Sequence, residues 1–207
     1  MKKIWYFLIL STVSFNALAQ EKTDENEDKP KGFQKDKLFT GGSLNLSFGN
    51  RTTALGISPY FGYSLNKYID VAASVGVNYT SQRDPTGYGV GDKIRQTIIG
   101  PGALLRIFPV HFLFAQAQYE HNFIKYKYLS SPNSSYADYT ANIEANSLLV
   151  GGGYSQGRRD GTMFYYLSVL WDVANNANSP YVDELNRALP IFRAGIQIGL
   201  FQGKSKR

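Results

Sequence analysis

The stretch PIFRAGIQIGLF, residues 190–201, alternates between apolar and polar or small side chains. Successive side chains of a β-strand point to opposite sides, so this stretch has two distinct faces. One face is apolar: Phe192, Ala194, Ile196, Ile198 and Leu200. The other carries Arg193, Gly195, Gln197 and Gly199. This pattern, with an aromatic residue at its end, is typical of the closing strand of a membrane β-barrel.

Seven further segments alternate in the same way, although less cleanly in the fourth and sixth strands. Their approximate ranges are 38–49, 52–64, 68–80, 94–108, 112–125, 142–155 and 162–174. Three connections, near Asn66, Pro109 and Arg158, are short, whereas those at 81–93, 126–141 and 175–189 are long. Short periplasmic turns and longer outer loops are the rule for outer-membrane barrels. The sequence therefore predicts an all-β fold, an eight-stranded antiparallel up-and-down transmembrane β-barrel.

Two features leave this strand map open. Pro59 and Pro101 fall inside predicted strands, where proline removes a ladder donor and indicates bulges or shifted strand ends. Alternation also fits a soluble lipocalin-like binding barrel, whose apolar face would point inward. We favour the membrane barrel, because the polar face consists mostly of Gly, Ser, Asn and Gln, which suit a narrow lumen, while Lys lies in turns, loops and termini.

The N-terminus has the parts of a secretory signal peptide, predicted over residues 1–19. Lys2 and Lys3 precede an apolar core, and the small-x-small site Ala17-Leu18-Ala19 places the cleavage before Gln20. Residues 20–37 contain few apolar side chains and are predicted to form a disordered charged leader. The barrel is expected over 38–201 and a basic C-terminal tail over 202–207. We therefore expect export through the periplasm into the outer membrane.

Composition narrows the functional classes. The chain has no cysteine, which excludes disulfides, thiolate metal sites and cysteine nucleophiles. Its formal net charge is +6, but the basic residues are scattered through turns, loops and the tail, so we expect no nucleic-acid partner. A basic surface also suits anionic lipid head groups. No pattern indicates a cofactor or a metal site.

Three stretches carry a resemblance to a known family: GGSLNLSFG at 41–49, ISPYFGY at 57–63 and the closing strand. The chain resembles the outer-membrane protein β-barrel domain proteins of Gram-negative bacteria, which are relatives in form of the small OmpX/OmpA-type barrels. The resemblance covers about Leu38 to Phe201. It implies a monomeric barrel that contacts outer-membrane lipids, lipopolysaccharide and the barrel assembly machinery, and it carries over no catalytic residues. One departure is that Phe201 is not the last residue.

A catalytic site is not expected. Nucleophilic hydrolysis needs a Ser, a His base and an acidic orienter within hydrogen-bond reach. The chain has only His111, in a predicted periplasmic-side turn, and His121, which follows Glu120 but faces the opposite way on the same strand. No serine stands two residues after His121. A lipid-modifying enzyme therefore remains only an alternative.

Six charged residues are predicted to face the lumen: Asp70, Arg106, Glu120, Glu144, Asp172 and Arg193. A buried charge without a partner is costly, so we expect pairing of Asp70 with Arg106, and of Asp172 with Arg193, with Glu144 close by. A structural plug of ion pairs and amide hydrogen bonds is favoured over a transport site, because eight strands leave an interior just wide enough for side chains.

The sequence thus favours a non-enzymatic outer-membrane barrel with a structural or surface-interaction role. The discriminating segment is the predicted outer loop containing Tyr126, Tyr128, Tyr136 and Tyr139, because aromatic residues with Ser and Asn favour recognition of an extracellular ligand. A narrow pore or small-molecule channel is the second alternative.

Overall fold

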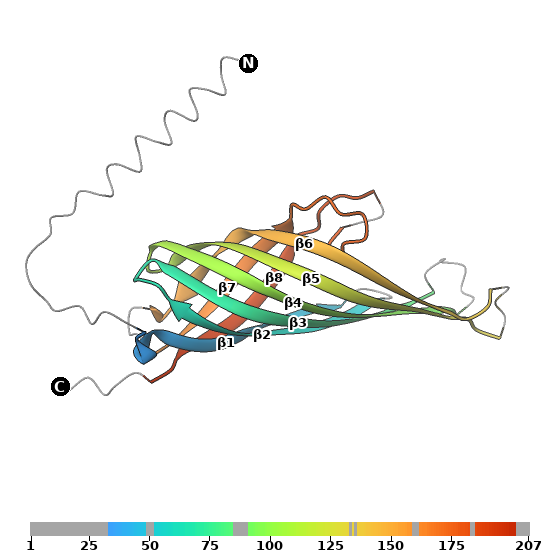
Figure 1. The fold of residues 1–207 in the computed structure, drawn as a ribbon. Helices are drawn as coiled ribbons and strands as arrows, with labels where there is room; N and C mark the ends of the chain where they lie inside the picture. Colours follow the sequence, from blue (N-terminus) through green and yellow to red (C-terminus); the bar gives the residue numbers. More distant parts are fainter. Residues whose placement is uncertain are drawn as a thin grey trace, which may run out of the picture. The chain divides into compact units, whose positions relative to one another are not determined.

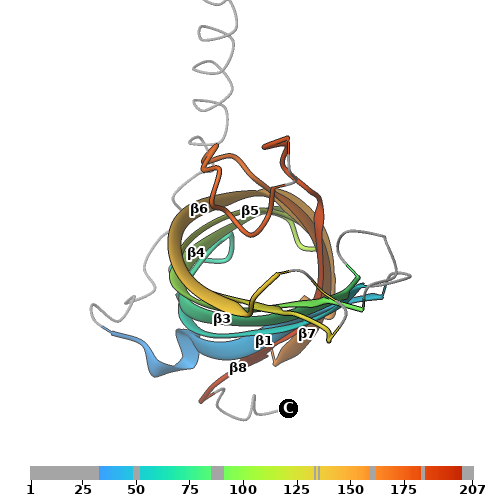
Figure 2. The ribbon, with the colours of Figure 1, turned by 90° about the vertical axis from the view of Figure 1, so that its right-hand side faces the viewer.

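Eight antiparallel strands close into a barrel in chain order, with β1 pairing β8 (Figure 1). The computed structural model describes residues 33–48, 52–84, 91–132, 134, 136–158, 162–182 and 185–201. The strands are β1 (Leu38–Phe48), β2 (Thr52–Ser64), β3 (Ile69–Arg83), β4 (Lys93–Val110), β5 (Leu113–Leu129), β6 (Tyr139–Gln156), β7 (Met163–Asp172) and β8 (Ile191–Gly199). Figure 2 shows the closed ring they form. The predicted fold class is confirmed.

The predicted signal peptide, most of the predicted leader and the C-terminal tail lie outside the described residues. The described end of the leader, residues 33–37, includes a single 3-10 turn, η1 (Lys35–Lys37), which precedes β1. No helix in the described ranges is long and apolar enough to cross a membrane.

The two faces of every strand separate cleanly. Large apolar side chains point outward and stay exposed, including Leu55, Ile57, Phe61, Val75, Val77, Ile99, Leu105, Leu167 and Trp171. The buried interior holds polar and charged side chains such as Asp70, Arg106, Gln118, Glu120 and Arg193, together with two clusters of buried apolar residues. A lipocalin-like arrangement would have the opposite facing. A closed barrel with an apolar exterior satisfies its backbone hydrogen bonds inside lipid, so this barrel spans the outer membrane.

Pro59 and Pro101 lie inside β2 and β4, so the strands run through them. Both point outward, and both stand next to Val75 of β3. Pro59 keeps its pairing with Gly42 of β1, but the β2–β3 register is interrupted between Ile57 and Tyr60. The β4–β5 register is likewise interrupted between Ile99 and Gly102. Each proline therefore removes pairing on one side only, which is how the barrel accommodates it.

An aromatic cluster fills the periplasmic end of the lumen. Its buried members are Phe39, Tyr60, Ala72, Leu104, Phe108, Phe114, Phe164 and Tyr166. Inward glycines make room for the rings, because a Cβ atom on Gly62 would lie 2.4 Å from the Phe39 ring and one on Gly195 would lie 2.3 Å from the Tyr166 ring. In β6, Gly153 gives way to Phe114 in the same manner. The Phe114 ring thus accounts for one of the three consecutive glycines in the sixth strand, whereas Cβ atoms on Gly151 and Gly152 would meet backbone atoms of neighbouring strands.

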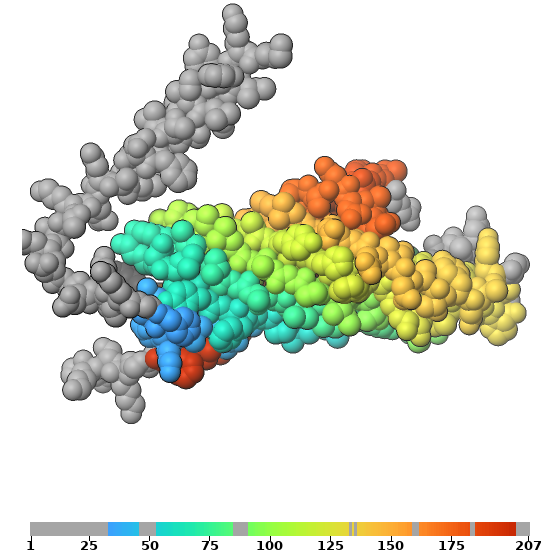
Figure 3. Space-filling model, viewed as in Figure 1, coloured from blue at the N-terminus to red at the C-terminus, as the bar shows by residue number. Residues whose placement is uncertain are grey.

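Strands β3 to β6 are the four longest, with 15 to 18 residues, and their outer parts project beyond the barrel as an extension (Figures 1 and 3). The predicted tyrosine-rich loop at 126–141 is therefore wrong in its bounds. β5 continues to Leu129 and β6 begins at Tyr139, so three of the four tyrosines lie on strands. Aromatic side chains favour strands when they can pack against a partner across the ladder, as Tyr128 does with Tyr139.

The outward face predicts a depth-dependent cost for charge. Val75→Arg would place a cation near mid-strand against lipid and should cost roughly 2–4 kcal/mol of folding free energy. The control Thr53→Arg, also outward but near the outer end of β2, should cost roughly 0–1 kcal/mol. Unfolding in lipid vesicles, followed by heat-dependent gel mobility, measures both. Equal costs for the two variants would contradict the assigned facing.

Candidate functional site: the lumen network and the outer extension

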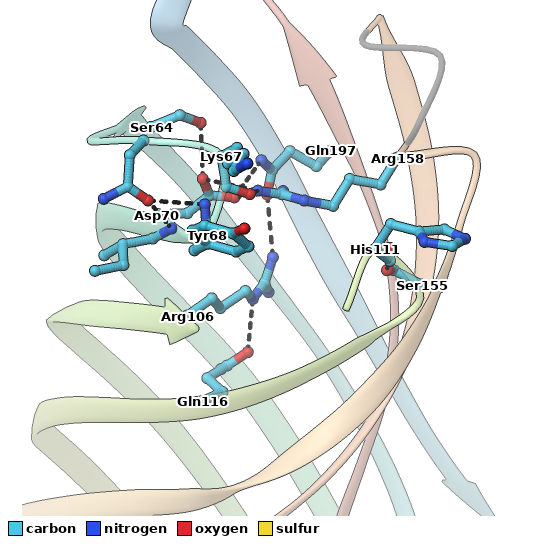
Figure 4. A network of polar contacts seen from close by, with 12 residues as sticks. Ser64, Lys67, Tyr68, Asp70, Arg106, His111, Gln116, Ser155, Arg158 and Gln197 are labelled. Carbon is cyan, nitrogen blue, oxygen red and sulfur yellow. Dashed lines mark hydrogen bonds and ion pairs between the residues drawn. The ribbon is translucent and has the colours of Figure 1, made fainter. Parts of the chain in front are cut away.

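Asp70 anchors the periplasmic half of a polar network inside the barrel (Figure 4). Its carboxylate forms an ion pair with Arg158, at 2.7 Å, and accepts hydrogen bonds from Ser64 Oγ at 2.7 Å and Gln197 Nε2 at 3.1 Å. Arg158 comes from the β6–β7 turn and also covers the Phe108 ring, 3.5 Å from its centroid. These contacts tie β2, β3, β8 and a distant turn together.

Arg106 occupies the next level of the lumen. Its guanidinium donates to Gln116 Oε1 at 2.8 Å, Gln197 Oε1 at 3.1 Å and the Tyr60 hydroxyl at 3.2 Å. The guanidinium carbon also lies 4.1 Å from the centroid of the Tyr166 ring. Cation–π attraction and several charge-assisted hydrogen bonds together hold this fully buried cation.

The predicted pairing of Asp70 with Arg106 is wrong, although the two residues stand opposite each other in the β3–β4 register. Gln197 bridges them instead, because its amide donates to Asp70 and its carbonyl accepts from Arg106. The aromatic rings draw Arg106 away, and Arg158 takes its place beside Asp70. Period counting could have placed Gln197 and Tyr60 inside, but no sequence signal brings a turn arginine to Asp70.

A second ionic group lies in the outer half of the lumen. Arg193 forms an ion pair with Glu120 at 3.1 Å and donates to Gln118 Oε1 at 3.0 Å. The Tyr181 hydroxyl, from the segment between β7 and β8, donates to the other Glu120 oxygen at 2.7 Å. Gln118 and Gln116 link this group to Arg106, so hydrogen bonds run continuously from the periplasmic turns to an outer loop.

The predicted ion pair between Asp172 and Arg193 does not form. Arg193 stands opposite Ser168, not Asp172, in the β7–β8 register. Asp172 is buried but accepts from the Leu148 and Ala174 amides and from the Ser179 hydroxyl, so it fixes the start of the loop. Glu144 is not in the lumen: it points outward, is exposed, and lies 3.7 Å from His121 Nε2. The inward parity of β6 runs unbroken from Ala145 to Ser155, whereas the polar residues Asn142, Glu144 and Asn146 point outward in the outer part of the strand.

Side chains fill the lumen between these groups. The interior space bounded by Ser43, Ser58, Ser74, Arg106, Gln118 and Arg193, among others, amounts to about 10 Å³. This is about the space of a single water molecule. Within the described residues, the barrel interior is therefore a packed polar core and not an open passage.

The outer extension has its own organisation. Tyr128 and Tyr139 stack with ring centroids 5.5 Å apart, Tyr126 stacks on Tyr139 at 5.9 Å, and Tyr136 meets Tyr128 edge-on at 6.2 Å. The buried carboxylate of Asp92 accepts hydrogen bonds from the hydroxyls of Tyr128 and Ser134 and from the Ser131 amide. The Asp138 carboxylate likewise accepts from the Ser130 amide and hydroxyl, so aromatic stacking and two carboxylates pin the tip of the extension.

The two histidines do not build a catalytic site. His111 is exposed in the turn between β4 and β5, and its ring packs against Phe112. His121 faces outward, with Nδ1 2.7 Å from Asn146 Oδ1 and its ring against Phe123. Ser155 Oγ donates to the backbone carbonyl of His111 at 3.0 Å, but neither imidazole ring is hydrogen-bonded to a serine side chain in the described part of the chain. Across the same residues, no three metal-ligating side chains gather into a site.

The closed strand order, the apolar exterior and the filled polar lumen together decide the architecture. The fold is that of a small eight-stranded outer-membrane barrel. No protein-family model matches this chain, and no curated protein matches its sequence.

Several solved structures are similar to this small outer-membrane barrel. Ail, the attachment invasion locus protein of Yersinia pestis, in complex with the heparin analogue sucrose octasulfate, is 9% identical over 78% of this chain and 95% of its own, with a TM-score of 0.49. Neisserial surface protein A is 12% identical over 78% of this chain and 95% of its own, with a TM-score of 0.41. The N-terminal β-barrel domain of Pseudomonas aeruginosa OprF is 12% identical over 79% of this chain and 96% of its own, with a TM-score of 0.38. No function is transferred from these proteins.

The ion pair of Arg193 with Glu120 predicts that these two residues are energetically coupled, in place of the pair Arg193 and Asp172 expected from the sequence. Arg193→Ala should destabilise the barrel strongly, because a buried pair broken on one side costs roughly 3–5 kcal/mol. The double change with Glu120→Ala should cost less than the sum of the single changes. A double-mutant cycle on unfolding in detergent measures this. The matched cycle of Arg193 with Asp172 should show no coupling, and the reverse ranking would contradict the observed register.

The extension tip predicts a loss of order in acid. The hydrogen bond from Tyr128, followed by those from Ser131 and Ser134, lowers the pKa of Asp92 below its usual 3.8. The stabilisation of the tip by ionised Asp92 is thus complete above pH 3.8, and it is lost as the pH falls through the lowered pKa of the folded protein. The protection factor of the Ser131 amide, which corrects for the intrinsic slowing of exchange in acid, should be high at pH 6 and fall at low pH, whereas in Asp92→Asn it should be low at both. Asp36→Asn, at the opposite end of the barrel, is the control, and an unchanged profile for Asp92→Asn would contradict the pinning role.

Proposed function

We propose that this protein is a non-enzymatic surface-interaction protein of the outer membrane, which recognises extended polypeptide segments through its outer extension. The extension comprises the outer parts of β3 to β6 and carries the stacked tyrosines. The observation on which the proposal rests is the free edge of β6.

The edge arises because β6 outruns β7. The outermost pair between them is Leu149 with Asp172, whereas β6 pairs β5 up to Tyr139. Leu148 directs its amide and carbonyl toward the β7 side, where they meet Asp172 and Val173. Backbone direction alternates along a strand, so Thr140, Asn142 and Glu144 direct theirs to the same side. Among the described residues, no backbone or side-chain group hydrogen-bonds their amides or carbonyls.

Exposed strand edges pair readily with other chains, and proteins usually protect them with proline, bulges or charge. The outer part of β6 contains no proline, and its register with β5 runs without a bulge. Glu144 is its one charged side chain. An unprotected edge supports recognition by strand addition, in which backbone hydrogen bonds supply affinity and neighbouring side chains supply specificity.

The tyrosines support the same proposal. Because Tyr126, Tyr128 and Tyr139 stack on one another and lie on strands, the extension is rigid before any ligand arrives. A preorganised surface loses less conformational entropy on binding than a mobile loop does. Exposed Tyr136 and Tyr139 offer aromatic area beside the edge.

The alternatives receive less support. A narrow pore would need continuous space, whereas side chains joined by hydrogen bonds occupy the lumen. A lipid-modifying enzyme would need a base near a nucleophile, whereas His121 contacts Asn146, Phe123 and Glu144 on the outer surface. We further propose a monomer that contacts outer-membrane lipids, lipopolysaccharide and the barrel assembly machinery.

A matched pair of variants tests the edge. Asn142→Pro removes the amide that points to the free side, whereas Asn142→Ala keeps it. Barrel in lipid nanodiscs should select extended peptides from a displayed library of random eight-residue segments. Asn142→Pro should weaken binding of the selected peptides at least tenfold, and Asn142→Ala should leave it within a factor of about two. Selection of no peptide, or equal binding by the two variants, would overturn the proposal.

A further inference from the structure

We propose a second binding site, on the outward face of β3 to β5, that takes the phosphate groups of outer-leaflet lipid headgroups. Its central residues are Arg95, Lys125 and Lys127. Together with Tyr79 and Thr97, they form a surface that we call the basic rows. This site rests on the proposed contact with outer-membrane lipids and names the residues that make it, but it is independent of peptide binding, because it lies on the face of the sheet and not at the β6 edge.

The strand register brings these residues together. Tyr79, Thr97 and Lys125 stand side by side on β3, β4 and β5, and Ser81, Arg95 and Lys127 form the next row outward. Arg83 and Lys93 form a further row beyond them. All belong to the outward parity of their strands. The first two rows line a surface hollow of about 300 Å³ bounded by Tyr79, Arg95, Thr97, Lys125 and Lys127.

Positive charges face one another across neighbouring strands in this region. Arg95 stands directly opposite Lys127, and Arg83 stands directly opposite Lys93. Like charges at opposite positions of a sheet destabilise it. In the described ranges, no acidic side chain pairs with Arg95, Lys125 or Lys127. The nearest outward acid on the neighbouring strand, Glu144, stands opposite Phe123 and pairs with His121. A bound anion would relieve this repulsion.

The location of the rows selects a lipid headgroup. Val77, Ile99 and Phe123 form the row immediately on the barrel side of Tyr79, Thr97 and Lys125, and all three are exposed apolar residues that face lipid. Adjacent rows are two residues apart, or about 7 Å along a strand. The cations therefore begin where the apolar surface ends, and a tyrosine marks the boundary, as at membrane interfaces.

The side chains suit phosphate. The Arg95 guanidinium can bind two phosphate oxygens at once, and the lysines supply mobile point charges on either side of it. The Thr97 and Tyr79 hydroxyls add neutral donors at the floor of the hollow. A phosphomonoester on a lipid anchored in the outer leaflet would reach this set without leaving its membrane depth.

The test uses barrel reconstituted in phosphatidylcholine nanodiscs that contain a minor fraction of phosphatidic acid, a lipid with a phosphomonoester headgroup. Native mass spectrometry of the released barrel gives the enrichment of phosphatidic acid over phosphatidylcholine. Each basic residue near a membrane surface contributes about fivefold in anionic lipid binding. The triple variant Arg95→Gln, Lys125→Gln, Lys127→Gln should therefore lose most of the enrichment.

The control triple, Lys35→Gln, Lys37→Gln, Lys67→Gln, removes the same charge at the periplasmic end and should retain the enrichment. Lys125→Arg with Lys127→Arg should also retain it, and heat-dependent gel mobility verifies that every variant is folded. Equal enrichment in the two triple variants would overturn the proposal. A wild-type barrel that binds heparin, a soluble polyanion, but does not enrich phosphatidic acid would also overturn it. The rows would then serve a soluble ligand.

Discussion

An eight-stranded barrel leaves an interior only one layer of side chains wide, and this constraint governs the rest of the molecule. Most inward polar side chains find their partners within that space, although Asn122 Oδ1 and Ser168 Oγ have none among the described residues. The interior therefore divides into an aromatic periplasmic end and a hydrogen-bonded polar column above it. Tyr60 and Arg106 join the two parts, since each takes part in ring contacts and in hydrogen bonds. Function then falls to the surfaces that remain.

The alternation of single strands was sufficient to predict the fold, the facing of most residues and the burial of five lumen charges. It was not sufficient to predict partners. A parity argument places Asp70, Arg106 and Arg193 inside but says nothing of depth or reach, so Arg158 and Tyr181, which enter the lumen from connecting segments, were missed. Glu144 was misplaced because the outer part of β6 reverses the usual polarity, with Asn142, Glu144 and Asn146 outward and Leu149 inward. The tyrosine segment was taken for a loop because Ser, Asn and Pro follow it closely.

The outer extension presents two surfaces of different chemistry. Its edge offers backbone donors and acceptors to a protein segment, whereas its outward face offers cations to the membrane. The two do not compete for residues, and cations held at the headgroup level would orient the extension relative to the bilayer. Stacked tyrosines and the Asp92 hydrogen bonds keep both surfaces in fixed register.

The contact between Arg158 and Asp70 also has a kinetic meaning. The two residues are 88 positions apart in the chain, and they belong to the β6–β7 turn and to β3. Bringing such distant segments together requires the strands between them to be paired already, because closing a long loop has an entropic cost that early local contacts do not offset. We therefore expect the ion pair to form late in assembly. It would then lock the periplasmic end only after the cylinder has curved back upon itself.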